Sequence, residues 1–351
     1  MTDLINCGWL LTKSEMNKVR FIRALGLKSV HNQVRRRYGL EPNALAIPES
    51  ALNNPMTLIP ISEVNLWYQA LEKVTGNVDI VLEVASDIKP DELGAVSRWL
   101  LSGIDLASAI RRLNYGIGSL QSGAFLSGTQ SGHIIKWVYQ NPFIDPHNKV
   151  HDGMRAAIFM TKLIRHYVGE QFSPMRIMMP GIRQNDAKYK QYFGCDIGWN
   201  HSKSEVWFHS DLRMATQSMR PYRSNQSLAM NFTDLDEFLN MPEPDDEIKV
   251  IYEVINYSCH YGFPTVEKVS KLVGLSSQQF QRRLHALGMN FTNVMGYVMS
   301  NIAVDMMVKG ATVDEVSARL GYLNVASFNR MFKKQRALTP KQFIQRLQEL
   351  N

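Results

Sequence analysis

The sequence has few cysteines and no long apolar run. Cysteine occurs three times in 351 residues, at Cys7, Cys195 and Cys259. This odd number and wide spacing exclude a disulfide framework, offer no zinc motif and fit free thiols in a reducing cytoplasm. No segment approaches the roughly 18 consecutive apolar residues of a membrane span. The first residues lack a basic start, a sustained apolar stretch and a small-residue cleavage site, so neither a membrane protein nor a secretory signal is predicted.

The sequence also lacks the motifs of common catalytic sites. It contains no Gly-x-Ser-x-Gly elbow. The glycine-rich run 115–133 lacks a Gly-Lys-Ser/Thr ending, so a flexible turn region is predicted there instead of a phosphate loop. His147 and His151 are four residues apart without a third ligand nearby, and a polar loop is the favoured interpretation. We therefore predict no metal site, no cofactor and no enzyme activity.

The composition indicates a globular protein with an uneven charge. Apolar residues make up 45% and charged residues 20% of the chain, values typical of folded domains. At roughly 100–200 residues per domain, the length predicts two domains, or three. Residues 264–351 hold 12 Lys and Arg against five Asp and Glu, while residues 41–263 are acidic overall. This asymmetry points to a polyanion as partner of the C-terminal part, although a solvated basic face is the commoner cause.

An acidic segment at residues 234–247 marks the clearest boundary. It holds seven acidic residues, two prolines and no basic residue, and such segments stay solvated. We predict a linker there, between a domain at 1–233 and a domain at 248–351. The pattern before it predicts an α+β fold, with helices in 61–112 and 151–168 and strands at 133–139, 175–179 and 205–209.

The part after the linker contains an internal repeat of helical pattern. Residues 265–284 align with 312–332 at a separation of 47, which becomes 48 after a one-residue insertion. Duplication of this kind is strong information about architecture. The identical pairs are Thr265/Thr312, Val266/Val313, Val269/Val316, Ser270/Ser317, Gly274/Gly321, Phe280/Phe328 and Arg282/Arg330.

Each copy has the signals of a helix, a turn and a second helix. In the first copy Thr265 caps a helix and Gly274 ends it, since glycine adopts the left-handed conformation at little cost. Ser276 then begins the second helix, with Gln279 as its capping-box partner. The corresponding residues of the second copy are Thr312 with Glu315, Gly321 and Asn324.

These signals predict an all-α domain with two helix-turn-helix units joined by a long helix. The units cover about 265–287 and 312–336, and the joining helix covers 291–309. A final helix is expected after Thr339-Pro340, because proline suits the first helical position.

The second helix of such a unit can enter the major groove of double-stranded DNA. Asn and Gln can pair with adenine edges, Arg with guanine edges, and Lys and Arg with phosphates. The alternative is that these are ordinary solvent-exposed helix faces. Two repeat copies in series, both polar or basic on the outside, favour DNA binding over that alternative. The predicted DNA-binding residues are Ser277, Gln278, Gln281, Arg282, His285, Asn324, Val325, Ser327, Asn329, Arg330, Lys333 and Lys334.

Residues 264–346 resemble the DNA-binding region of the AraC/XylS family of bacterial transcription regulators. The most specific stretch is 321–343, which resembles the family's Gly-aromatic, Ser-x-Phe-x-Arg-x-Phe-Lys and Thr/Ser-Pro signature. The first copy and the joining helix match more loosely. The positions that carry the resemblance in this stretch are Gly321, Tyr322, Phe328, Arg330, Phe332, Lys333, Pro340 and Phe343.

The sequence departs from the family pattern at three places. Ala337 replaces the usual glycine before the Thr-Pro turn, and Ser300-Asn301 replaces a basic pair in the joining helix. Val325 and Ala326 stand where polar base-reading residues are common. They could contact thymine methyl groups, or the second helix could mainly grip phosphate.

Most of residues 20–215 resemble, more weakly, the arabinose-binding-type effector domain of one AraC subgroup. The resemblance implies an N-terminal domain that senses a small molecule of unknown identity, forms a homodimer, or both. It also implies a cytoplasmic activator that contacts promoter DNA and RNA polymerase. The alternatives are a protein-interaction module and a DNA-tethered enzyme that uses the N-terminal domain.

Some basic and aromatic residues have simpler interpretations. Arg35-Arg36-Arg37 is predicted to be a solvated helix end, although contact with DNA or the other domain is an alternative. Four tryptophans of the N-terminal part are predicted to lie in its core, and any of them could line a ligand pocket. These are Trp67, Trp99, Trp137 and Trp207.

Overall fold

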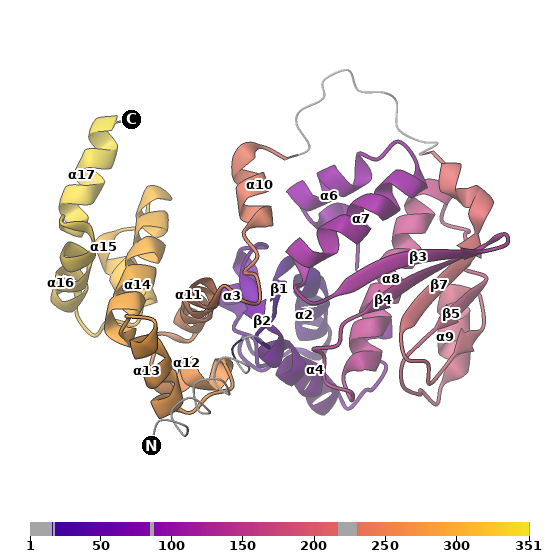
Figure 1. Ribbon diagram of the computed structural model, residues 1–351, viewed down its shortest axis with the longest axis horizontal. Coiled ribbons are helices and arrows are strands. Elements are labelled where there is room, and N and C mark those ends of the chain that lie inside the picture. The colour runs from indigo at the N-terminus through magenta and orange to yellow at the C-terminus, as the bar shows by residue number, and fades with distance from the viewer. Residues whose placement is uncertain (1–15, 17, 85–87, 217–229, 351) are drawn as a thin grey trace. The chain divides into compact units, whose positions relative to one another are not determined.

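A computed structural model describes residues 16, 18–84, 88–216 and 230–350. The chain divides into an N-terminal unit, Arg20–Met241, and a second unit, which comprises Pro242–Asn351 together with Met1–Val19. Figure 1 shows strands and helices in the first and helices in the second. Cys7 lies outside the described residues, Cys195 and Cys259 are free, and Cys259 is buried.

The N-terminal unit is built on a five-stranded sheet with the order β3-β4-β7-β5-β6. All neighbours pair antiparallel except β5 and β6, which are parallel. A separate antiparallel pair, β1 with β2, begins the unit. The strands are β1 (Phe21–Arg23), β2 (Leu58–Pro60), β3 (Phe125–Ser131), β4 (Ile134–Gln140), β5 (Arg176–Met178), β6 (Ile197–Gly198) and β7 (Ser204–His209).

Helices surround this sheet. The long α8 packs against β4 and β7, and α7 packs along β3. The helices are α2 (Leu25–Tyr38), α3 (Glu49–Asn53), α4 (Ile61–Thr75), α5 (Ile80–Glu83), η2 (Pro90–Glu92), α6 (Ala95–Leu101), α7 (Leu106–Leu120), α8 (Lys149–Val168), α9 (Asp186–Phe193), η3 (Ser210–Met214) and α10 (Phe232–Leu239). The predicted α+β class is therefore confirmed. The three predicted strands are β4, β5 and β7, and the helix predicted at 151–168 is α8, whereas β1, β2, β3 and β6 were not predicted.

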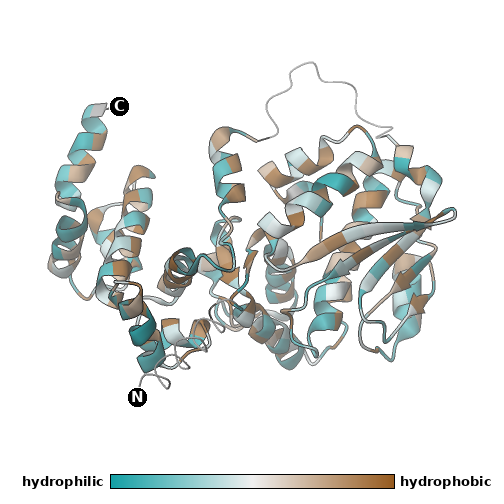
Figure 2. Ribbon diagram, viewed as in Figure 1, coloured by the Kyte–Doolittle hydropathy of each residue, from teal (hydrophilic) through white to brown (hydrophobic). Residues whose placement is uncertain are grey.

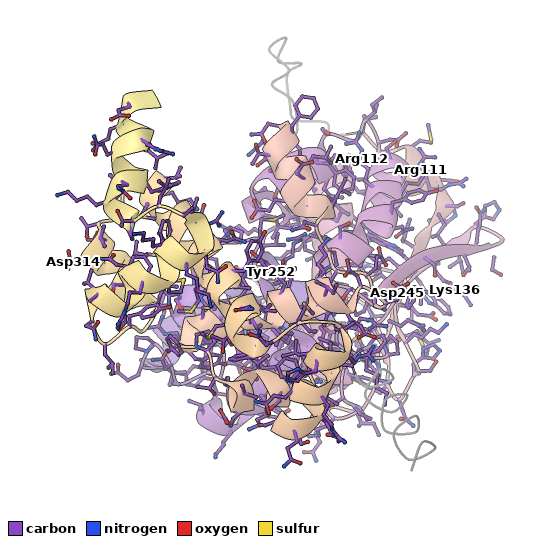
Figure 3. All side chains as sticks on the ribbon, turned by 60° about the vertical axis from the view of Figure 1, so that its left-hand side comes forward. Arg111, Arg112, Lys136, Asp245, Tyr252 and Asp314 are labelled. Carbon is purple, nitrogen blue, oxygen red and sulfur yellow. The ribbon has the colours of Figure 1, made fainter. Side chains whose placement is uncertain are left out.

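Alternation along the strands explains the core. In β7, Val206 and Phe208 are fully buried, while Trp207 between them is half-buried. Side chains of a strand alternate between its two faces, so Trp207 lies on the other face, where the ammonium of Lys136 is 4.2 Å from its ring centroid. Figure 3 labels Lys136. Trp67 and Trp137 are fully buried as predicted. For Trp207 and the half-buried Trp99, the prediction of a core position was too strong.

Two segments differ from the sequence predictions. The first part of the predicted linker is α10, which begins with a capping box between Asn231 and Asp234. The α10 carbonyls of Glu237 and Phe238 accept hydrogen bonds from the buried Arg23 guanidinium at 2.6 and 2.8 Å. The side chains of Asp236 and Glu237 are exposed, as the acidic composition predicted, but the segment forms a helix that is held by the buried Phe238 and by the carbonyls that bind Arg23. The run 115–133 is likewise not a flexible turn region, since it contains the end of α7 and all of β3.

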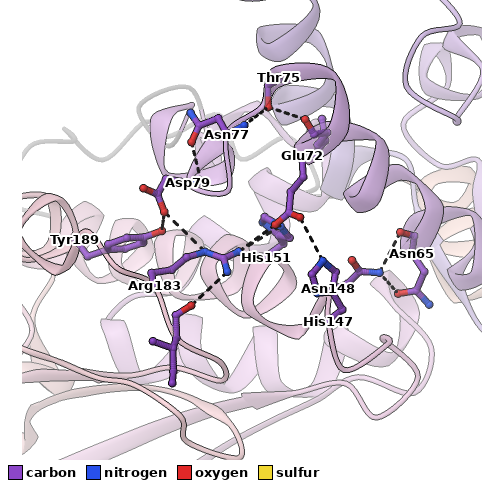
Figure 4. A network of polar contacts seen from close by, with 12 residues as sticks. Asn65, Glu72, Thr75, Asn77, Asp79, His147, Asn148, His151, Arg183 and Tyr189 are labelled. Carbon is purple, nitrogen blue, oxygen red and sulfur yellow. Dashed lines mark hydrogen bonds and ion pairs between the residues drawn. The ribbon is translucent and has the colours of Figure 1, made fainter.

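The two histidines four residues apart both contact Glu72 of α4 (Figure 4). His151 Nε2 is 2.6 Å from Glu72 Oε1, and His147 Nε2 is 3.3 Å from Glu72 Oε2. The hydrogen bond with His151 lowers the pKa of Glu72 to about 2. His147 is exposed, but His151 is buried on α8, so the predicted polar loop was wrong for His151. Within the described ranges, no group of three or more His, Cys, Asp or Glu side chains is arranged to hold a metal ion.

The second unit consists of helices in its described part. They are α11 (Glu247–Ser258), η4 (Cys259–Tyr261), α12 (Val266–Leu272), α13 (Ser277–Ala286), α14 (Phe291–Val308), α15 (Val313–Arg319), α16 (Val325–Arg336) and α17 (Pro340–Leu350). Figure 2 shows hydrophobic and hydrophilic residues interleaved along its long helices. None of the helices described in either unit combines the length and apolarity needed to cross a membrane.

Candidate nucleic-acid interface

The helix pairs α12–α13 and α15–α16 are built in the same way. Thr265 caps α12 and Thr312 caps α15, each by accepting a hydrogen bond from the main-chain N–H three residues on. The carboxylate of Glu315 completes a capping box with Thr312, and these hydrogen bonds lower the pKa of Glu315. The caps satisfy N–H groups that a helix start would otherwise leave without partners.

The turns of the two pairs also agree. Gly274 and Gly321 adopt φ values of 73° and 77°, in the left-handed region that glycine enters easily. In each turn the N–H of the following residue bonds to the carbonyl five residues before it, at 2.9 Å for Leu275 and 3.0 Å for Tyr322. The repeat read in the sequence is thus a repeat of local structure.

The second helix of each pair starts at a capped residue. Ser276 and Gln279 form a capping box at the start of α13. Asn324 caps α16, with its Oδ1 2.8 Å from the N–H of Ser327. The buried face of α13 is anchored by Phe280 and that of α16 by Phe328, both fully buried. Each helix therefore has a fixed start and one apolar face turned to the core.

The opposite faces carry most of the residues that the sequence predicted for DNA contact. Gln278, Gln281, Arg282 and His285 are exposed on α13. The four that are only half-buried are Ser277, Val325, Ser327 and Asn329. The exposed members of the second pair are Asn324, Arg330, Lys333 and Lys334.

Several predicted contact residues also have partners within the protein. The Ser277 hydroxyl is 3.3 Å from that of Ser270, so it faces α12. Arg330 Nη2 donates to the Ser327 hydroxyl at 3.1 Å. The Asn329 Oδ1 atom is buried and has no hydrogen-bond partner among the described atoms. Ser277 and Asn329 are therefore less available to a base edge than the sequence pattern suggested.

Arg283, which the sequence analysis did not select, holds α13 in place. It follows the exposed Arg282 but is only 3% exposed, and its Nε donates to Glu247 Oε2 of α11 at 2.6 Å. A second hydrogen bond joins Arg283 Nη2 to Glu247 Oε1, so the pair is bidentate. Neighbouring residues of a helix point about 100° apart, which separates a buried arginine from an exposed one. Only the helical stripe of Phe280, Arg283 and Leu284 could have signalled this position.

The surrounding helices supply further polar support. The Tyr252 hydroxyl of α11 accepts a hydrogen bond from Asn301 Nδ2 of α14 at 2.8 Å, and Figure 3 shows Tyr252 in this unit. His260 lies below α15, where burial and the charge of Arg319 lower its pKa to about 4. His260 is thus neutral at pH 7 and adds no charge to the basic surface.

Comparison with known proteins assigns both units. A helix-turn-helix domain model matches residues 269–346. The model of the arabinose-binding domain of AraC transcription regulators, an N-terminal domain, matches residues 41–216, half of the chain. The protein belongs to the AraC family of transcription regulators.

Individual sequence relatives of this AraC-family protein match over a short length, and one solved structure aligns over most of the chain. The uncharacterized HTH-type transcriptional regulators Mb1430 of Mycobacterium bovis and Rv1395 of Mycobacterium tuberculosis are each 34% identical over 85 residues. The match covers 24% of this chain and about a quarter of the length of each relative. The crystal structure of the transcriptional regulator CdpR from Pseudomonas aeruginosa aligns with 90% of this chain and 96% of that chain, at a TM-score of 0.39 and 14% identity.

The structure explains two departures from the AraC pattern. Ser300 and Asn301, which replace a basic pair, both accept hydrogen bonds from the Arg336 guanidinium at the end of α16. Ala337 occupies the usual glycine position with φ 60°, a left-handed conformation that costs a residue with a Cβ atom more than it costs glycine. Ser300 and Asn301 therefore connect α14 to α16 by hydrogen bonds, whereas the backbone at Ala337 is strained.

Proposed function

We propose that this AraC-family protein is a sequence-specific DNA-binding transcription regulator with two helix-turn-helix units. The observation that carries the proposal is the exposed polar row on α13 and on α16, each backed by the same capped and glycine-ended helix. Each second helix would enter one segment of the major groove. The two segments would lie about one helical turn of DNA apart, roughly 34 Å, with α14 setting the spacing.

The two helices differ in the chemistry that they offer. The exposed α13 side chains Gln278, Gln281 and Arg282 can reach base edges, since amides suit adenine and guanidinium suits guanine. The last turn of α16 contains Lys333, Lys334 and Arg336, which suits phosphate. Arg336 is already bonded to Ser300 and Asn301. We therefore expect α13 to contribute most of the base readout and α16 most of the phosphate contact.

The N-terminal unit would control this activity by sensing a small molecule, by forming a homodimer, or by both. A ligand shifts such a regulator only by the difference in its affinity for two conformations. RNA polymerase is the expected protein partner, and a chromosomal target would place the protein in the cytoplasm.

Genome-wide crosslinking of the full-length protein to its own chromosome tests the proposal. A variant with Arg282, Arg330 and Lys333 changed to Ala should lose discrete promoter peaks that the natural protein shows. Lys309→Ala is the matched control, because Lys309 is an exposed base of the same unit, paired with Asp305 on α14. Equal loss of the peaks in the control would attribute binding to bulk charge. Peaks that persist in the triple variant would refute the assigned face.

Binding to a recovered promoter site then assigns the role of Arg282. If Arg282 reads a base, Arg282→Ala should weaken binding to that site by about 1–3 kcal/mol and leave non-specific DNA nearly unaffected. An equal loss on all sequences would make Arg282 a phosphate contact.

A further inference from the structure

A cavity of about 320 Å³ lies within the N-terminal unit. Its lining residues come mainly from α2, α7 and α8, and this volume falls in the range of about 300–1,000 Å³ usual for small-molecule sites. The cavity is separate from the helices proposed to bind DNA.

The walls of the cavity are mainly apolar. The apolar part of the lining offers no hydrogen bonds, so the sugar hydroxyls that face it would be buried without partners at a cost of about 1–3 kcal/mol each. An aliphatic chain would instead bury apolar surface favourably. The apolar lining includes Leu25, Leu113, Ile117, Leu120, Phe159 and Met160.

The described lining residues carry positive charge without any acidic side chain. Arg155 is ion-paired with the buried Asp152 at 2.8 Å, which neutralises it. Arg23 is bonded to main-chain carbonyls, including Ser119 O at 2.7 Å. Lys28, Arg36 and Lys89 add three further positive charges to the lining. This excess of positive charge favours an anionic ligand over a neutral or cationic one.

Two buried donors meet at one wall of the cavity. Gln121 is 2% exposed, and its Oε1 accepts a hydrogen bond from Arg155 Nη2 at 3.0 Å. Its Nε2 is buried without a hydrogen-bond partner among the described atoms, although buried donors are nearly always paired. Gly26 lies beside Arg155, and a Cβ added there would be 3.6 Å from Arg155 Nη1. The glycine thus leaves this edge of the guanidinium uncovered.

We propose that the cavity binds an aliphatic monocarboxylate, whose oxygens accept hydrogen bonds from Gln121 Nε2 and Arg155 while its chain lies along α7 and α8. A carboxylate is the smallest anion that matches a guanidinium edge and one amide donor. The inference rests on the proposed function in that the cavity would be the effector site of the regulator.

Calorimetric titration of the purified full-length protein tests this inference. The probes are butanoate, octanoate and dodecanoate, with octanamide as the uncharged match for octanoate and L-arabinose as a sugar. Octanoate or dodecanoate should bind one per chain, and octanamide should bind at least tenfold more weakly than octanoate. No binding by any carboxylate, or equal binding of octanoate and octanamide, would overturn the inference.

Variants locate the site and guard against misfolding. Gln121→Leu should weaken octanoate binding about tenfold, whereas Gln171→Leu, at an exposed glutamine of the same unit, should leave it unchanged. Gly26→Leu should abolish binding by filling the space beside Arg155. Arg36→Gln, at an exposed position, should weaken octanoate several-fold and leave octanamide binding unchanged. An unchanged octanoate affinity in Gly26→Leu would place the ligand elsewhere and refute the site.

The DNA experiment distinguishes this inference from the regulator proposal. Promoter peaks without carboxylate binding would reject only the ligand assignment. Carboxylate binding without any DNA enrichment would support the cavity assignment and reject the regulator function.

Discussion

Breaking the ion pair between Glu247 and Arg283 should destabilise the DNA-binding unit far more than breaking an exposed pair. Both side chains are nearly buried, at 6% and 3% exposure. Glu247→Gln leaves the buried guanidinium without its countercharge, and removing one partner of a buried pair costs about 3–5 kcal/mol. Asp305→Asn breaks the Asp305–Lys309 pair, whose side chains are 63% and 68% exposed. That change should cost at most about 1 kcal/mol.

Urea unfolding of the full-length protein can measure this difference. Five of the six tryptophans lie in the N-terminal unit Arg20–Met241, so tryptophan fluorescence mainly follows that unit, and circular dichroism at 222 nm follows helices of both units. Glu247→Gln should move a dichroism transition to lower urea and leave the fluorescence transition in place. Amide exchange of α13 should become roughly a hundredfold to a few thousandfold faster if opening limits it.

The double variant Glu247→Leu with Arg283→Met separates loss of the pair from an unpaired charge. Replacing both partners by apolar residues is often neutral or stabilising by about 1–4 kcal/mol. We expect the double variant to recover most of the stability that Glu247→Gln loses. A loss of less than 1 kcal/mol in Glu247→Gln, or no recovery in the double variant, would refute the reasoning.

Four other changes have defined outcomes. Gly321→Ala should cost several kcal/mol, because its Cβ would lie 2.5 Å from a main-chain nitrogen, whereas Gly288→Ala, with similar φ and open space, should cost only about 1–2 kcal/mol in urea unfolding. Ala337→Gly should stabilise the same unit by up to about 1 kcal/mol, since it relieves a φ of 60°; a loss of stability would show no strain there. Burial lowers the pKa of His31 to about 4, so the unfolded chain binds this proton first and stability falls as pH drops from about 6.5 to 4. His31→Gln should flatten that fall by at most about 1.4 kcal/mol per pH unit in fluorescence-monitored unfolding, and an unchanged profile would contradict this. Lys333→Ala should lower the slope of log affinity against log salt by about one on every DNA sequence, and an unchanged slope would exclude a phosphate contact.

Local sequence signals predicted the helix starts and turns of the second unit correctly. The caps at Thr265, Ser276 and Thr312 and the turns at Gly274 and Gly321 lie where the sequence predicted them. Each depends on residues within five positions of one another, so chain geometry alone decides it. In the N-terminal unit, local pattern located β4, β5 and β7 but not the other four strands, and it could not give the strand order, which depends on long-range pairing.

Long-range contacts escaped the sequence. The acidic composition of 234–247 suggested a solvated linker, but Arg23, more than 200 residues earlier, binds the carbonyls of α10. Likewise, the helical stripe of α13 hints that Arg283 is buried and Arg282 exposed, but it does not identify Glu247, the partner of Arg283, which lies 36 residues away. Composition predicts only the average tendency of a segment to be exposed to solvent. Whether a given group is buried depends on the specific partners that the fold places beside it.

The sequence by itself determined the repeat, the helix starts and ends, and the exposed polar row of α13, because these follow from short-range geometry and helical period. The tertiary structure alone decided which charges are buried and where a cavity remains. Gln121, Arg155 and Gly26 come from separate segments, and only their packing leaves an unpaired donor beside an uncovered guanidinium. The free energy of burying each of these groups depends on neighbours that are distant in the chain, so a local sequence pattern cannot predict it.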